Sequence, residues 1–372
     1  MRCEIQIDAA ALRHNYQTFQ KLAGQATLIP VVKSNAYGHG LREVYEALKE
    51  INPGWLAVNY LSEAESLRSL GFEGRILVVG PIRSSDLGWA FKLNCDIFLA
   101  ERNLLSAWVL LPPAQQARGH IKFDTGMSRQ GFMPDEVPGL LALLAPHKAR
   151  LVGICSHFSN VEDVLEQSYA LQQLETFMSV VKQFKDLGFT LLPHIAASSS
   201  ALIMQDSRLA MIRVGISMYG LWPSRATQLS YLQSMGHMLE LKPLLSWTCE
   251  LALTKSIQAG QFIGYGCTFK ALRDMRIGLL PIGYFEGYPR LASNRGHVLI
   301  DGQRCPIVGR ICMNMMMVDI SHLQDLEVGT TVTLIGKSGT ESIDASQIGE
   351  WAETIHYEII TKLNSDIPRV LR

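Results

Sequence analysis

The first part of the chain alternates short apolar runs with stretches that repeat apolar residues at helical spacing. The first runs lie at residues 29–32 and 55–58. Helices are predicted at 41–51 and from Ser62, a credible N-cap with Glu65 three residues on. The rhythm continues in apolar runs at 75–79, 97–99, 120–124, 151–155, 191–196 and 211–214, with helices near 84–91 and 103–110. About eight βα units of this kind predict a closed (β/α)8 barrel. An open doubly wound sheet is the alternative, but no GxGxxG motif follows the first strand.

The pattern changes around residues 230–241, and short strands separated by turn signals follow. They are predicted at 246–252, 276–280, 297–300, 305–308 and 331–335, with a helix near 345–353. Regular short strands with turns such as Asp301-Gly302 are typical of an all-β domain. We therefore predict two domains, a barrel at 1–236 and a β-strand domain at 237–372, with no internal repeat beyond the βα rhythm.

Composition narrows the class of protein. Among 372 residues, Lys+Arg and Asp+Glu both number 34, and this balance argues against nucleic acid or an anionic membrane as partner. The seven cysteines form no CxxC pair, which predicts reduced thiols and neither a disulfide framework nor a metal site. The N-terminus lacks the apolar core of a signal peptide, and the longest stretch without charged residues, 187–205, contains Pro193 and His194. These features predict a soluble, cytoplasmic protein.

Lys33 ends the first apolar run and begins a polar, glycine-rich loop. A lysine at the end of a buried strand loses solvation, which lowers its pKa towards neutrality. A partly neutral amine can attack an aldehyde, so Lys33 is a candidate Schiff-base lysine. The alternative is a structural lysine whose ammonium reaches solvent from the strand end.

Other ionisable groups follow the later strands of the predicted barrel. Lys122, Asp124 and Arg129 follow the fifth strand, His157 follows the sixth, three serines from Ser198 follow the seventh, and Arg213 lies on the eighth. Barrel active sites form at the carboxyl ends of the strands. The sequence therefore predicts that these groups gather at one end of the barrel.

These residues occur within words that are shared by one family, over nearly the full length of the chain. The words are Val32-Lys33-Ser34-Asn35-Ala36-Tyr37-Gly38-His39-Gly40, Asp124-Thr125-Gly126-Met127, Ser156-His157-Phe158, Arg213-Val214-Gly215-Ile216, Gly264-Tyr265-Gly266, Gly283-Tyr284, Gly287-Tyr288-Pro289-Arg290, Val308-Gly309-Arg310-Ile311-Cys312-Met313 and His356-Tyr357-Glu358. In this order the chain resembles the alanine racemases, fold-type III enzymes that use pyridoxal 5′-phosphate.

The resemblance implies a binding site for the cofactor. Lys33 would hold it covalently, and Arg213 would face the pyridine nitrogen, which then stays unprotonated because a guanidinium only donates. Related barrel decarboxylases carry a carboxylate in place of Arg213, so this residue favours racemisation. The remaining cofactor contacts implied by the family are Tyr37, His157, Ser198, Gly215, Ile216 and Tyr357.

The resemblance also implies a two-base reaction in a head-to-tail homodimer. Lys33 would act on one face of Cα, and Tyr265 of the partner subunit would act on the other. A hydrogen-bonded chain through His157 and Arg213 would help the tyrosine act as a base. The backbone amide of Met313 would meet the substrate carboxylate from the second subunit.

Further residues match the substrate contacts and entrance of the family. Arg129 would bind the cofactor's phenolic oxygen and the substrate carboxylate. Lys122 matches a lysine that is carbamylated in some members, the alternative being an ion pair with a carboxylate such as Asp124. The narrow entrance that limits substrate size would comprise Glu162, Tyr284, Arg290, Arg310, Ile355 and Tyr357.

The chain departs from the family pattern in a few places. Asn314 stands where aspartate is usual, Phe285-Glu286 replaces the commoner Ala-Asp, and Ala197 replaces an asparagine. Retention of Tyr357 favours alanine as the substrate. The resemblance implies that the D-alanine produced is used for peptidoglycan. The alternatives are a serine or broad-specificity racemase, and a non-enzymatic carrier of pyridoxal 5′-phosphate on the same scaffold.

Overall fold

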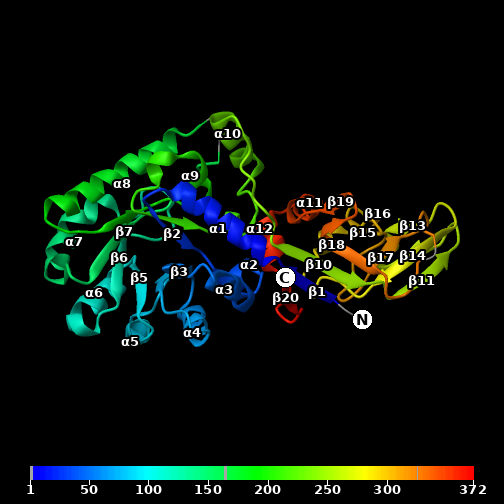
Figure 1. Ribbon diagram of the computed structural model, residues 1–372, viewed down its shortest axis with the longest axis horizontal. Helices are drawn as coiled ribbons and strands as arrows, with labels where there is room; N and C mark the ends of the chain where they lie inside the picture. The colour runs from blue at the N-terminus through cyan, green and yellow to red at the C-terminus, as the bar shows by residue number, and fades with distance from the viewer. Residues whose placement is uncertain (1–2, 163–165, 325) are drawn as a thin grey trace. The chain divides into compact units, whose positions relative to one another are not determined.

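The computed structural model describes residues 3–162, 166–324 and 326–372 (Figure 1). The chain forms two compact units. The barrel unit contains Ala10–Ser34 and Tyr45–Pro243, and the strand-rich unit contains the chain up to Ala9, Asn35–Val44 and Leu244–Arg372. The second unit is therefore built from both ends of the chain and from the short segment that follows Lys33.

Eight parallel strands close the barrel unit. They are β2 (Thr27–Pro30), β3 (Trp55–Val58), β4 (Arg75–Val78), β5 (Cys95–Leu99), β6 (Arg118–Lys122), β7 (Leu151–Cys155), β8 (Leu192–His194) and β9 (Met211–Val214). Strands β3 to β8 pair in sequence order, and β2 pairs with β9. A parallel bridge between Val31 and Ala57 joins β2 to β3, and the Arg213 amide donates to the Ala196 carbonyl between β9 and β8. The ring is therefore complete, and the predicted barrel is confirmed.

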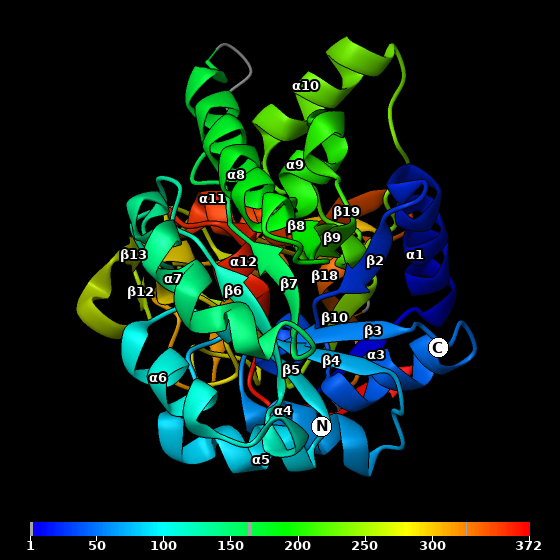
Figure 2. The same cartoon turned by 90° about the vertical axis from the view of Figure 1, so that its left-hand side faces the viewer.

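Helices connect consecutive strands and cover the outside of the ring (Figure 2). They are α3 (Leu41–Lys49), α4 (Leu61–Ser69), α5 (Leu87–Lys92), α6 (Arg102–Leu110), α7 (Val137–Leu144), α8 (Ser168–Asp186) and α9 (Ser198–Ile203), with α1 (Ala9–Ala23) before β2 and α10 (Arg225–Met235) after β9. Most strand residues are buried on both faces, as expected of parallel strands covered by helices, although β8 is exposed at Leu192.

The start of α4 differs from the sequence prediction. Its N-cap is Tyr60, so Ser62 lies inside the helix and the predicted cap at Ser62 is wrong. The Glu63 carboxylate accepts hydrogen bonds from the amides of Asn59 and Tyr60 and, on its other oxygen, from the amide of Ser34. Glutamate at the third helical position satisfies the amides of the N-cap and of the residue before it, and it also anchors the loop after Lys33.

The strand-rich unit contains one large sheet and two small ones. The large sheet has the order β16 (Gln303–Pro306), β15 (His297–Ile300), β18 (Thr331–Ser338), β10 (Leu245–Glu250), β1 (Cys3–Ile7) and β20 (Arg369–Leu371), with β19 (Glu341–Ile343) paired to β18. The small sheets are β11 (Leu253–Ile257), β14 (Met275–Leu280) and β17 (Met316–Asp319), and the pair β12 (Phe262–Ile263) and β13 (Phe269–Lys270). Helices α11 (Ala345–Trp351) and α12 (His356–Thr361) complete the unit. The expected mostly-β fold of this part is confirmed.

No helix in the described part of the chain has the length and apolar character that a membrane crossing requires. Within the same residues, no three His, Cys, Asp or Glu side chains are grouped so that they could hold a metal ion. All seven cysteines are free.

Candidate functional site

Lys33 begins an unusual turn at the end of β2. The segment α2 (Lys33–Tyr37) has helical spacing, but its last four residues have φ values of 56°, 53°, 51° and 53°. It is therefore a left-handed turn, a conformation that costs L-residues roughly 1–2 kcal/mol each. Strained backbone of this kind concentrates at functional sites. Burial lowers the pKa of Lys33, and the charge of Arg129 adds to this effect, whereas Glu63 opposes it.

Lys122, Arg129 and His157 line a small hollow in the barrel unit. Lys122 is 3% exposed, and burial lowers its pKa to about 8. The ion pair considered for Lys122 and Asp124 is not formed. Instead, the Asp124 carboxylate accepts four backbone amides, those of Gly126, Met127, Ser128 and Arg129. The charge of Arg129 lowers the pKa of Lys122 and of His157, which is consistent with the close approach of these three side chains.

Arg213 is buried and bound on nearly every side. Its Nη1 donates to Nδ1 and to the carbonyl of His194. Its Nη2 donates to the carbonyls of Ser156 and Ile195 and to Nδ1 of His157, the last over 3.2 Å. A guanidinium has five N–H groups. The remaining one, on Nε, has no hydrogen-bond partner among the residues that the structure describes.

The residues predicted to bind phosphate fall into two sets. In the barrel unit, the Ser198 hydroxyl accepts a hydrogen bond from the Gly215 amide over 3.0 Å, and Ile216 follows directly. Tyr37 and Tyr357 belong to the strand-rich unit. Burial raises the pKa of Tyr37 to about 12, so its hydroxyl keeps its proton and can donate. Tyr357 packs against His356, with 4.7 Å between ring centroids.

Tyr265 lies on the surface of the strand-rich unit with 73% of its side chain exposed. It sits between Gly264 and Gly266, whose φ values of 74° and 72° favour glycine. The Arg310 guanidinium packs against this turn, because a Cβ on Gly266 would lie 2.9 Å from its Nη1. The turn therefore presents the phenol outward on a supported backbone.

Met313 and Asn314 lie on a loop that is bonded to the Gly283–Tyr288 segment. The amides of Tyr284 and Phe285 donate to the carbonyls of Cys312 and Met313 over 3.1 and 2.9 Å. A Cβ on Gly283 would lie 2.2 Å from the Cys312 carbonyl oxygen, so only glycine permits this approach. The Met313 side chain is 56% exposed.

The predicted entrance residues are only partly assembled within either unit. Tyr284 and Arg290 line one pocket of about 530 Å³ in the strand-rich unit. Ile355, which is 61% exposed, directly follows Thr354 of the pocket lining. Arg310 lies at the Tyr265 turn instead. Glu162 belongs to the barrel unit, where its carboxylate accepts from the Ser199 hydroxyl over 3.0 Å.

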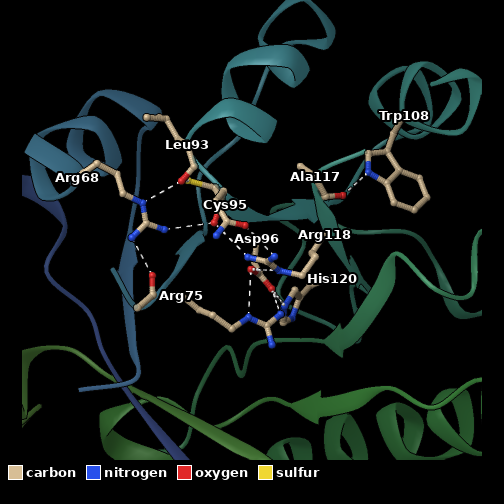
Figure 3. Close-up of polar contacts among 11 residues, drawn as sticks. Arg68, Arg75, Leu93, Cys95, Asp96, Trp108, Ala117, Arg118 and His120 are labelled. Carbon is tan, nitrogen blue, oxygen red and sulfur yellow. Dashed lines mark hydrogen bonds and ion pairs between the residues drawn. The ribbon is translucent and has the colours of Figure 1, made fainter. Parts of the chain in front are cut away.

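The sequence prediction missed a group of charged and imidazole side chains inside the barrel. Asp96 on β5 bonds to Arg75, Arg118 and His120 from the neighbouring strands (Figure 3). His194 on β8 joins the group through His120. The available signal was alternation: Arg118, His120 and Lys122 are spaced two apart on one strand and so share one face.

The two units and the lysine at the end of β2 define a class, (β/α)8-barrel proteins joined to a strand-rich unit. Residues 7–223 match the family model described as alanine racemase, N-terminal domain, and residues 244–371 match alanine racemase, C-terminal domain. The chain therefore belongs to the alanine racemase family, whose characteristic reaction makes it an isomerase.

Individual relatives agree along the whole chain. The curated alanine racemase of Leptospira interrogans is 34% identical over 369 residues, which span 99% of this chain and 95% of the relative. That of Desulforamulus reducens is 34% identical over 371 residues, 98% and 97% of the two chains. The alanine racemase structure from E. faecalis is 34% identical with a TM-score of 0.90, covering 100% of this chain and 98% of that one. The Bacillus anthracis structure with bound L-Ala-P is 31% identical with a TM-score of 0.90, covering 100% and 95%.

Proposed function

We propose that the chain interconverts L-alanine and D-alanine with pyridoxal 5′-phosphate as its cofactor. The observation that carries the proposal is the hydrogen bonding of Arg213. Its buried guanidinium donates four N–H groups to protein acceptors, and its Nε–H group remains to donate to a ligand. A donor that cannot lose its proton suits an unprotonated pyridine nitrogen. The Ser198 hydroxyl, which accepts from the Gly215 amide, would donate its own proton to a phosphate.

When bound, the cofactor would withdraw electrons from the substrate Cα so that its proton can leave. Lys33 would hold the cofactor and exchange this proton on one face. The lowered pKa of Lys33 supports this role, because a neutral amine is needed both to bond the cofactor and to accept a proton. The strained turn after Lys33 would fix the direction of its backbone.

Tyr265 of the partner subunit would exchange the proton on the other face, which makes a head-to-tail homodimer the active form. Its 73% exposure in the single chain supports this, since a base must be enclosed in the working site. Met313, 56% exposed on the same unit, would bring its amide to the substrate carboxylate. In such a site, the barrel domain of one subunit would supply Lys33 and the strand-rich domain of the partner subunit would supply Tyr265.

His157 would support Tyr265. Its Nδ1 accepts from Arg213, and an imidazole that accepts at Nδ1 and is neutral carries its proton on Nε2. Burial, followed by the charge of Arg213, keeps the pKa of His157 well below its ordinary value, so the neutral form is favoured. The Nε2–H group would then donate to the Tyr265 phenolate and stabilise it.

Arg129 would bind the substrate carboxylate and the phenolic oxygen of the cofactor. Lys122 would be carbamylated and would then orient Arg129 through an ion pair. Two features support this modification: the pKa of about 8 leaves a substantial neutral amine near that pH, and Asp124 does not neutralise it. A carbamate on Lys122 would replace a buried positive charge, which is repelled by Arg129 and Arg213, with a negative charge that they attract.

Alanine is the substrate that the retained Tyr357 favours, and its D-isomer would serve peptidoglycan synthesis in the cytoplasm. Tyr284 and Tyr357 would narrow the entrance together with Glu162, Arg290, Arg310 and Ile355. Phe285 and Asn314 are the residues that favour a serine or broad-specificity racemase. A panel of amino acids ranked by kcat/KM decides this, and a serine value equal to that of alanine would refute our choice.

The test uses the purified protein with pyridoxal 5′-phosphate and an assay for D-alanine. We expect the wild type to racemise alanine and to absorb as a protein with covalently held cofactor, and Lys33→Ala to lose both. Lys182→Ala, which removes an exposed lysine paired with Asp186, is the matched control and should retain both. Racemisation by Lys33→Ala would refute the proposal. Cofactor binding without racemisation by the wild type would favour a carrier protein.

A further inference from the structure

A row of buried polar side chains crosses the barrel interior and ends at Arg213. His194 accepts from Arg213 at Nδ1, and its Nε2 lies 2.8 Å from Nδ1 of His120. Nε2 of His120 lies 3.1 Å from Oδ2 of Asp96. His194, His120 and Asp96 are each 0% exposed. Their common burial and spacing make one continuous path, which we call the Arg213–Asp96 relay.

The positions of the protons in this relay follow from its two ends. Arg213 can only donate, so Nδ1 of His194 must accept and Nε2 must carry the proton of a neutral ring. Nε2–H of His194 then donates to Nδ1 of His120, whose own proton must be on Nε2. That proton is donated to Asp96, which as a carboxylate can only accept. Each member therefore has one allowed protonation state, and all bonds point away from Arg213.

The relay also connects two separated charges. Among the described residues, Arg213 forms no ion pair with a carboxylate, although it is buried. Asp96 at the other end is ion-paired with Arg75 and with Arg118, the latter over 2.8 Å (Figure 3). Hydrogen bonds in a chain polarise one another, so the Asp96 carboxylate makes His194 a stronger acceptor for Arg213.

The electrostatic surroundings favour the same protonation states. Burial is the largest effect on both imidazoles and lowers the pKa of His194 and of His120. The charge of Arg213 lowers both further, and at His120 the hydrogen bond and charge of Asp96 oppose burial without outweighing it. Asp96 remains ionised because hydrogen bonds from His120 and Arg75 outweigh the effect of burial on its pKa. Both imidazoles are therefore neutral, as the bonding pattern requires.

Packing leaves the rings of the relay little freedom to turn. A Cβ on Gly153 would lie 2.0 Å from Nδ1 of His120, so glycine at this position makes room for the ring. Trp55 meets the same ring edge to face, with 6.1 Å between centroids. Phe98 packs beside His194 at 6.1 Å. The barrel core is thus shaped around the two imidazoles.

We propose that His120, His194 and Asp96 are positioning residues that fix Arg213 in place, so that its Nε–H meets the cofactor ring in one geometry. This inference rests on the proposed function. None of the three residues touches the reacting atoms, and each acts through Arg213. When the relay is broken, Arg213 loses its anchored acceptor and the ring nitrogen is no longer held in its unprotonated form.

The consequence is a change in the outcome of the reaction, beyond a change in rate. A protonated ring is a stronger electron sink and favours transamination. In that side reaction alanine is oxidised to pyruvate, its nitrogen and two electrons pass to the cofactor, and water supplies the keto oxygen while pyridoxamine 5′-phosphate is formed. The ratio of pyruvate released to alanine racemised therefore reports the position of Arg213.

The first experiment measures this ratio in the holoenzyme and three variants. We expect His120→Phe to raise it on the order of tenfold, the scale of one lost hydrogen bond to a charged group. His120→Asn keeps an acceptor for His194 and should give a smaller rise. The control is Arg68→Met, because Arg68 donates to the carbonyls of Leu93, Phe72 and Gly74 beside the relay without joining it (Figure 3). An equal ratio in wild type and His120→Phe, or a rise in Arg68→Met as large as in His120→Phe, would overturn the proposal.

The second experiment reads the relay without using catalysis. Nitrogen-15 NMR of the histidine-labelled holoenzyme should find His120 and His194 as neutral rings protonated on Nε2 from about pH 5 to about pH 8, the range in which an ordinary imidazole titrates. Protonation on Nδ1, or an imidazolium, would overturn the relay even if the wild type racemises alanine. The expected tautomers in a protein that fails to racemise would refute the proposed function and leave the relay's geometry intact.

Discussion

Nδ2 of Asn314 donates a hydrogen bond to Oε1 of Glu286 across 2.8 Å. The other oxygen of Glu286 accepts the Gly283 amide over 2.7 Å, so one carboxylate ties together the two loops that carry Tyr284 and Met313. The resemblance to the family implies aspartate at each of these two places. The two positions contact each other, and the Glu286 carboxylate faces an amide where a second carboxylate would repel it.

This pairing predicts that Asn314→Asp is harmful by itself. The substitution removes one hydrogen bond and places a carboxylate against Glu286, at an expected cost of about 1 kcal/mol because the pair is exposed. The double variant with Glu286→Gln restores a donor and should recover most of the loss. Thermal unfolding of the two single variants and the double variant gives the coupling energy, and strictly additive effects would contradict the pairing.

The proposed sharing of the active site predicts complementation between two inactive chains. Lys33→Ala and Tyr265→Phe should each abolish racemisation alone. A heterodimer of the two contains one site with an intact Lys33 and an intact Tyr265 of the partner subunit. Random mixing makes half of the dimers heterodimers with one good site in two, so about a quarter of wild-type activity should return. No recovery after unfolding and refolding the mixture would show that Tyr265 does not serve the partner.

The barrel could be predicted because its signals are local. The runs at 55–58, 151–155 and 211–214 coincide with β3, β7 and β9, since each buried parallel strand is a continuous apolar segment. The pairing of β1 with β10 and β20 could not be foreseen, because it joins the two ends of the chain. Local patterns report which face of a strand is buried and do not report its neighbours.

The candidate site could likewise be predicted from the sequence only in part. Lys33, Lys122, His157 and Arg213 could be placed together because parallel strands present their carboxyl ends at one side of the barrel. The positive φ values after Lys33 escaped prediction, because Ser34 and Ala36 are not residues that favour a left-handed turn. His194 was also missed as a member of the site, since its importance depends on residues from three other strands.

The left-handed turn predicts an unusual response at Ser34. Glycine should relieve strain there and raise the free energy of unfolding by up to about 1 kcal/mol, whereas valine should lower it by at least about as much. Ser66, an exposed residue inside α4, is the matched control. At Ser66 glycine should destabilise the helix and valine should be nearly neutral. Chemical denaturation of the four variants measures these changes. If glycine lowered the free energy of unfolding at Ser34 as it does at Ser66, the left-handed geometry would be contradicted.

Carbamylation of Lys122 predicts a labelled adduct. The neutral amine attacks the carbon of CO2, forms a C–N bond and loses a proton. With ¹³C-bicarbonate near pH 8, where about half of the amine is neutral, wild type should give a carbamate carbon resonance. Lys122→Met should lack the resonance, and Lys182→Met, which changes an exposed lysine, should retain it. An identical signal from all three proteins would place the adduct elsewhere.

Without CO2, the buried Lys122 predicts a pH dependence of stability with a defined sign. Burial lowers the pKa from 10.5 to about 8, so between these values the unfolded chain binds more protons and stability rises with pH. Below about pH 8 the charged ammonium costs the fold up to roughly 3 kcal/mol. Lys122→Met should therefore be more stable than wild type at neutral pH and lack the rise at alkaline pH. Denaturant unfolding in CO2-free buffer measures both, and parallel pH profiles for the two proteins would contradict the burial of a titrating amine.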